Sequence, residues 1–143
     1  MTTELISEQE KKMKIFLKST IKNITDNTTE KDIVIAKKTK NRITYQIDNF
    51  KYTIVITSKK IIMNRKNDDL ECTMYFEEKK ETCSSYSLKE GYNIEINIKT
   101  NKLNITDKKI QITYTVIDTK TIYQYDIEMS EYNEHKKRNI FNN

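Results

Sequence analysis

Residues 61–76 read IIMNRKNDDLECTMYF, a stretch in which apolar and polar side chains alternate on both sides of the polar centre NDD. Side chains two positions apart lie on the same face of a β-strand. Ile61, Met63 and Arg65 therefore share one face, and that face is the apolar one. The stretch predicts an antiparallel hairpin that carries a guanidinium group on its buried side.

The turn sets the register of this hairpin. A tight turn at Asn67-Asp68 places Arg65 opposite Leu70 and Met63 opposite Cys72. An Arg that faces an apolar interior needs a partner, because an unpaired buried charge costs several kcal/mol. We therefore expect Arg65 to take part either in a binding site or in a structural hydrogen-bond network.

The next hairpin extends this inner face. A turn over residues 77–79 brings Thr82, Ser84 and Tyr86 to the same side as Arg65. The same parity places Cys72 and Cys83 on opposite faces, so we expect no disulfide between them.

Period-2 alternation continues over most of the chain, and the connections are short and polar. Strands are expected over residues 13–22, 33–37, 43–47, 52–57, 61–65, 70–76, 82–88, 92–100, 103–105, 110–118 and 121–129. Tight turns are expected at Ser58-Lys59, Asn67-Asp68, Asn101-Lys102, Asp107-Lys108 and Thr119-Lys120. Connections this short require antiparallel neighbours, and closure into a barrel removes the exposed strand edges. The sequence thus predicts an all-β fold, a single antiparallel up-and-down closed barrel of about eight to ten strands.

The barrel domain is expected over residues 13–130, with short polar tails at both ends. Residues 1–12 form a tail or a short helix, since Ser7 and Glu10 have the spacing of a capping box. Residues 131–143 form a polar tail or a helical turn.

The composition excludes several classes of protein. The net charge is +5, but the 26 basic residues are interleaved with 21 acidic ones and only Arg42, Arg65 and Arg138 are Arg. We therefore do not expect nucleic acid as a partner. No apolar run approaches the roughly 18–20 residues of a membrane span, so no membrane partner is expected. The N-terminus lacks an apolar signal region and the two cysteines are unpaired, which favours the cytoplasm.

The residues that most catalytic sites use are scarce. The single histidine, His135, lies in the C-terminal tail, and the single glycine, Gly91, excludes glycine-rich phosphate loops. Cys72 and Cys83 do not have the spacing of a metal site. We expect no catalytic residue, no metal and no cofactor, so enzymatic activity is not the favoured reading.

Several of these positions together resemble a known family. Arg65-Lys66-Asn67, Met74-x-Phe76, Tyr86, Gly91, Thr100 and Ile112-x-Tyr114 are similar to the pattern of the YwiB-like family. These are small bacterial proteins of unknown function with a lipocalin-like (calycin-type) β-barrel. The resemblance covers about residues 13–130 and implies a barrel whose interior can hold one small ligand.

The leading hypothesis is a non-enzymatic protein that binds a small amphiphilic or anionic molecule inside the barrel. The candidate ligand-binding residues are Arg65, Tyr86, Thr82, Ser84, Met63, Met74 and Tyr114. One alternative is that Arg65 is bonded to backbone carbonyls or to Tyr86 and binds nothing. Another is an interaction module that binds a protein or RNA through its Lys-rich exterior and the tail Lys136-Lys137-Arg138. The sequence predicts no oligomeric state.

Overall fold

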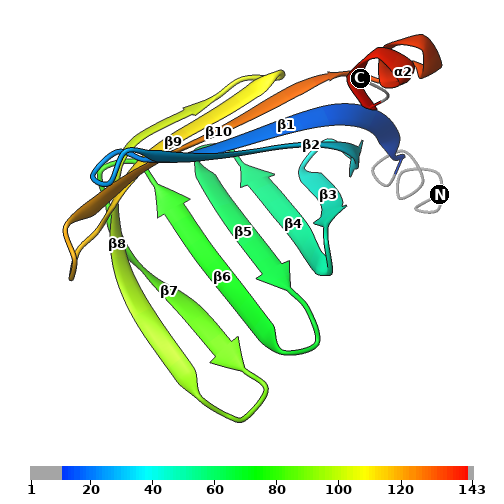
Figure 1. Cartoon of the computed structure of the whole chain (residues 1–143). Coiled ribbons are helices and arrows are strands. Elements are labelled where there is room, and N and C mark those ends of the chain that lie inside the picture. Colours follow the sequence, from blue (N-terminus) through cyan, green and yellow to red (C-terminus); the bar gives the residue numbers. More distant parts are fainter. Residues whose placement is uncertain (1–10, 142–143) are drawn as a thin grey trace, which may run out of the picture.

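The computed structural model of the protein describes residues 11–141 (Figure 1). Within this part of the chain it has ten strands and one helix. The strands are β1 (Met13–Asn23), β2 (Thr28–Lys38), β3 (Arg42–Ile47), β4 (Phe50–Thr57), β5 (Lys60–Lys66), β6 (Leu70–Glu77), β7 (Glu81–Leu88), β8 (Asn93–Ile105), β9 (Lys109–Val116) and β10 (Thr121–Glu131). The helix is α2 (Glu134–Phe141).

The strands form a closed up-and-down barrel, as the alternation predicts. Each strand is antiparallel to the next one along the chain, and β10 closes the barrel by pairing with β1. β2 and β3 pair only at Lys37–Thr44 and Lys38–Ile43, so the rest of β2 diverges from β3. This up-and-down order sends successive turns to opposite ends of the barrel.

The two ends of the barrel differ. We call the end whose interior is filled with side chains the closed end, and the end whose interior contains a cavity the open end. The closed end carries the turns at residues 39–41, 58–59, 78–80 and 106–108. The open end carries the turns at residues 24–27, 48–49, 67–69, 89–92 and 117–120.

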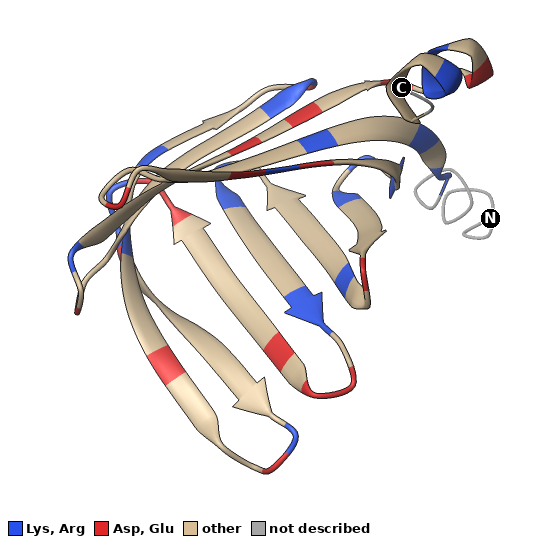
Figure 2. Cartoon of the chain, in the orientation of Figure 1, with Lys and Arg blue, Asp and Glu red and all other residues tan. Residues whose placement is uncertain are grey.

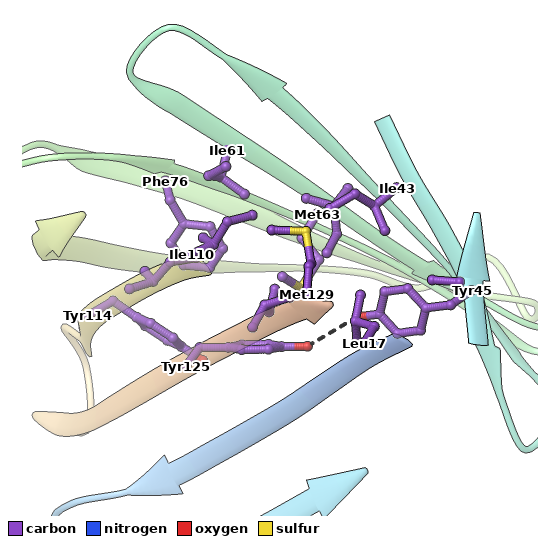
Figure 3. Close-up of a cluster of buried hydrophobic side chains, with 14 of the residues drawn as sticks. Leu17, Ile43, Tyr45, Ile61, Met63, Phe76, Ile110, Tyr114, Tyr125 and Met129 are labelled. Carbon is purple, nitrogen blue, oxygen red and sulfur yellow. Dashed lines mark hydrogen bonds between the residues drawn. The ribbon is translucent and has the colours of Figure 1, made fainter. Parts of the chain in front are cut away.

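The half of the interior toward the closed end is filled with apolar side chains (Figure 3). Ile43, Ile61, Ile110 and Ile127 are fully buried there, together with Phe76. Burying a side chain of this kind contributes about 1.5–3 kcal/mol. This cluster is therefore the main source of stability for the barrel.

The predicted register of the central hairpin is wrong by two residues, although the predicted faces are right. Arg65 lies opposite Cys72 and Met63 opposite Met74. The side-chain oxygen of Asn67 accepts hydrogen bonds from the backbone N–H groups of Asp69 and Leu70, which makes a longer turn than expected. A shift of two keeps every side chain on its original face, because the side-chain period of a strand is two.

The turn predicted at Asn101-Lys102 is also wrong. β8 runs without interruption through this point, and its pairing with β9 contains a bulge between Thr100 and Lys102. A bulge inserts one extra residue and bends a strand without ending it, so the polar pair resembles a turn in the sequence.

Of the two predicted tails, only the C-terminal one lies mostly within the described residues. The possible helix at Ser7 and Glu10 lies outside the described residues. Residues 134–141 form α2, which lies against the outside of β1, where Phe16 stacks near Tyr132 and Phe141. No helix in residues 11–141 has the length and apolar character needed to cross a lipid bilayer.

Candidate functional site

A cavity of about 410 Å³ occupies the interior toward the open end. This volume is within the range typical of small-molecule sites, about 300–1,000 Å³. Five tyrosines form much of its wall: Tyr52, Tyr86, Tyr114, Tyr123 and Tyr125. Aliphatic and sulfur-containing side chains form most of the rest: Ile21, Met63, Met74, Ile96, Ile98 and Val116.

Arg65 is the single charged side chain that lines this cavity within the described residues. It is partly buried near the open end of β5, and its guanidinium carbon lies 4.9 Å from the centroid of the Phe50 ring. Partial burial lowers the pKa of Arg65, but Tyr52, Cys72 and Tyr86 together outweigh this effect, and the pKa lies above its ordinary value. Arg65 is therefore a permanent cation in the cavity wall.

The charge of Arg65 has no acidic partner within 4.0 Å. None of the three ion pairs in residues 11–141 includes Arg65, and its buried Nε atom has no hydrogen-bond partner. No Asp or Glu lines the cavity in this part of the chain. The cavity wall thus presents a positive charge that has no salt-bridge partner.

Two neighbouring strands place a thiol and a phenol beside Arg65. Cys72 on β6 lies opposite Arg65, and Tyr86 on β7 lies opposite Cys72. Burial raises the pKa of the Cys72 thiol, although Tyr86 and Arg65 partly offset the effect. Burial also raises the pKa of Tyr86 to about 12. Both groups are neutral at physiological pH, so neither supplies a nucleophile nor cancels the charge of Arg65.

A second hollow of about 440 Å³ adjoins the cavity at the divergence of β2 from β3. Arg65 and Tyr52 line both spaces. Glu30, Lys31 and Asp32 of β2, and Asp48 of the turn between β3 and β4, also line this hollow. Arg65 therefore stands between the cavity and the solvent.

The fold is similar to a solved barrel. It matches the crystal structure of the ywiB protein from Bacillus subtilis with a TM-score of 0.65 and 14% sequence identity, over 87% of this chain and 94% of that one. At this identity the likeness concerns the fold, and it confirms the predicted YwiB-like barrel architecture. Neither the protein-family models nor the curated proteins give a match to the sequence.

Six of the seven candidate residues lie around the cavity: Arg65, Tyr86, Ser84, Met63, Met74 and Tyr114. Ser84 is fully buried, and its hydroxyl has no hydrogen-bond partner. Thr82 does not line the cavity. Its hydroxyl donates a hydrogen bond to the backbone carbonyl of Tyr75 on the neighbouring strand, so this side chain stabilises the pairing of β6 with β7.

The sequence reasoning singled out Tyr86 and Tyr114, but not the other three tyrosines of the cavity, Tyr52 on β4 and Tyr123 and Tyr125 on β10. Tyr52 on β4 stacks against Tyr45 with ring centroids 4.8 Å apart. The hydroxyl oxygen of Tyr125 on β10 lies 3.4 Å from that of Tyr45 (Figure 3). Strand parity alone indicates that these rings face inward, but only closure of the barrel brings them to one cavity.

Residues 11–141 bring together no group of three or more His, Cys, Asp or Glu side chains that could hold a metal ion. Both cysteines are free, Cys72 in the interior and Cys83 on the exposed face. The cavity wall offers one cation, several hydroxyl groups and an apolar surface.

Proposed function

We propose that this protein binds one small molecule in the open-end cavity, and that the ligand combines an anionic head with an apolar body. The observation that carries the proposal is the charge of Arg65, which has no salt bridge and lies in the wall of a cavity without acidic side chains. A carboxylate or phosphate is the natural partner for a guanidinium group, which can donate two parallel hydrogen bonds to it.

The rest of the wall suits the body of such a ligand. The side chains beyond Arg65 are apolar or aromatic, and two of them, Met63 and Met74, are flexible enough to adjust to its shape. Binding of one small molecule within a barrel is the mode that lipocalins use. The free thiols are consistent with a reducing compartment, and we place the protein in the cytoplasm.

The alternative in which Arg65 serves only the fold has less support. Arg65 makes no hydrogen bond to a backbone carbonyl in residues 11–141, and its Nε atom remains unpartnered. Its contacts to the Phe50 ring and the Tyr52 hydroxyl leave guanidinium N–H groups free for a ligand.

A matched pair of probes tests the proposal. Decanoate and decanol share an apolar chain and differ in the charge of the head, so their affinities isolate the contribution of Arg65. The chain has no Trp, and tyrosines line the cavity, so tyrosine fluorescence reports occupancy. We expect wild type to prefer decanoate, and Arg65→Met to lose about 10–100-fold in decanoate affinity, as for a charged hydrogen bond.

The control is Arg42→Met, which removes a positive charge from the exposed face of β3. Its affinity for decanoate should match wild type. Equal binding of decanoate to the Arg65 and Arg42 variants would contradict the proposal. Native mass spectrometry of the purified protein provides an independent readout through any co-purified small molecule.

A further inference from the structure

The up-and-down topology separates charges that are interleaved in the sequence. Every turn at the closed end contains lysine: Lys40, Lys59, Lys79-Lys80 and Lys108. Lys11 and Lys12 precede β1 at this end, and Lys136, Lys137 and Arg138 lie in α2, which follows β10 there. These ten basic residues outnumber the three acidic ones in the same turns and helix, Glu78, Asp107 and Glu134, so the closed end is a basic surface.

The open end has the opposite character. Every turn at that end contains an acidic residue: Asp26, Asp48, Asp68-Asp69, Glu90 and Asp118 (Figure 2). The net charge of +5 is thus distributed unevenly along the barrel axis. Successive turns lie at opposite ends of the barrel. Because lysine-containing turns alternate with acid-containing turns along the chain, the folded barrel has a basic end and an acidic end.

Apolar side chains accompany the lysines at the closed end. Met13 at the start of β1 is 58% exposed, and Phe141 at the end of α2 is 44% exposed. The open end also has exposed apolar side chains, Ile24, Leu88, Tyr92 and Ile94, so it is the sign of the charge that distinguishes the two ends. Large exposed apolar side chains beside a basic surface are typical of proteins that bind the interface of a membrane.

We propose that the closed end docks onto a membrane surface that contains anionic lipids. This peripheral contact needs no membrane-spanning segment, and it replaces the expectation from the sequence that the protein has no membrane partner. The turns at one end of a barrel form a ring, and a flat surface can contact the whole ring at once. Lysines near an anionic membrane each strengthen binding by about fivefold. Met13 and Phe141 are placed to enter the headgroup region while the open end faces the solvent.

The observations favour a lipid surface over a nucleic acid. Lysine acts as a point charge and suffices for attraction to a charged surface, whereas Arg is preferred for bidentate contacts to phosphates and bases. The closed end has only Arg42 and Arg138. Its exposed aromatic residue, Phe141, belongs to the helix beside the ring of turns rather than to a groove that could follow a strand of nucleic acid.

Two quadruple variants with the same net charge test the proposal. The closed-end variant replaces Lys12, Lys40, Lys59 and Lys108 by Gln. The open-end control replaces Lys22, Lys66, Lys89 and Lys120 by Gln. All eight side chains are exposed and make no hydrogen bond or ion pair within the described residues, so both variants should fold.

Binding is measured by flotation with vesicles of equimolar phosphatidylcholine and phosphatidylglycerol, and with vesicles of phosphatidylcholine alone. We expect wild type to bind only the anionic vesicles. The closed-end variant should bind on the order of a hundredfold or more weakly at low salt. The control should change little, because its lysines lie about 20 Å away along the axis, about twice the Debye length at 0.1 M salt.

An orientation measurement completes the test. In a Cys83→Ser background, an environment-sensitive dye at Asn41→Cys should shift its emission on anionic vesicles, whereas the same dye at Asp69→Cys should not. Absence of wild-type binding to anionic vesicles, or equal loss in both quadruple variants, would overturn the proposal. Tighter binding to an oligonucleotide than to the vesicles would replace it with a nucleic-acid surface. Each outcome is independent of whether decanoate occupies the cavity.

Discussion

Replacement of Arg65 by Met should leave the stability of the protein almost unchanged while it removes ligand binding. The variant loses the contact to the Phe50 ring, worth about 0.5–1 kcal/mol. It also loses a hydrogen bond to Tyr52, worth about 0.5–1.5 kcal/mol. Removal of the buried, unpartnered Nε atom recovers about 1–3 kcal/mol. These contributions nearly cancel, so we expect the free energy of unfolding to change by less than about 1 kcal/mol.

Urea unfolding monitored by circular dichroism measures this change, with Arg42→Met as the matched control for loss of a positive charge. A small change in midpoint together with the loss of decanoate binding would assign Arg65 to recognition. A loss of more than about 2 kcal/mol, well beyond the control, would show that Arg65 holds the fold together and would refute the reasoning.

Three further predictions concern the barrel itself. Ile110→Ala, in the filled half, should cost about 3–4 kcal/mol, whereas Ile96→Ala, in the cavity wall, should cost less than about 1.5 kcal/mol, as measured by urea unfolding. Similar costs would contradict the division into two halves. Lys79 has a φ of 62°, so Lys79→Gly should raise the free energy of unfolding by about 0.5–1 kcal/mol, whereas Lys40→Gly should lower it. A loss at Lys79 would show that its backbone is unstrained. Burial raises the pKa of Tyr125 and other interior tyrosines, so the unfolded chain releases their protons first. The contribution of these tyrosines to stability should therefore be constant below about pH 10 and fall above it, by up to about 1.4 kcal/mol per pH unit for each buried tyrosine. A flat urea midpoint across this range would exclude that linkage.

Strand parity was predictable from the sequence because it survives errors in register. The central hairpin is shifted by two residues from the expected pairing, yet Arg65, Met63 and Met74 keep their inward positions. Errors of this size leave the faces unchanged because the side chains alternate with period two. For this reason the candidate residues on neighbouring strands could be predicted from the sequence.

The role of Thr82 and the course of β8 were not predictable in the same way. Parity places Thr82 inward, but its hydroxyl is held by the Tyr75 carbonyl near the closed end of β7, beyond the cavity. The bulge near Thr100 depends on how β8 curves around the barrel, which is a property of closure. Local patterns contain no information about curvature.

The separation of the interior into two halves explains how one small barrel can be both stable and hollow. The isoleucines of the closed half are buried regardless of what occupies the open half. The open half keeps a cavity and an Arg65 side chain without a salt-bridge partner, features that contribute little to stability without a ligand. A ligand that binds only the folded state must then stabilise the protein, by about 2.7 kcal/mol at a concentration 100 times its Kd. Decanoate should consequently raise the melting temperature of wild type and not that of Arg65→Met. If the closed end also docks on a membrane, the two activities lie at opposite ends of the barrel, and a change at one end should leave the other intact.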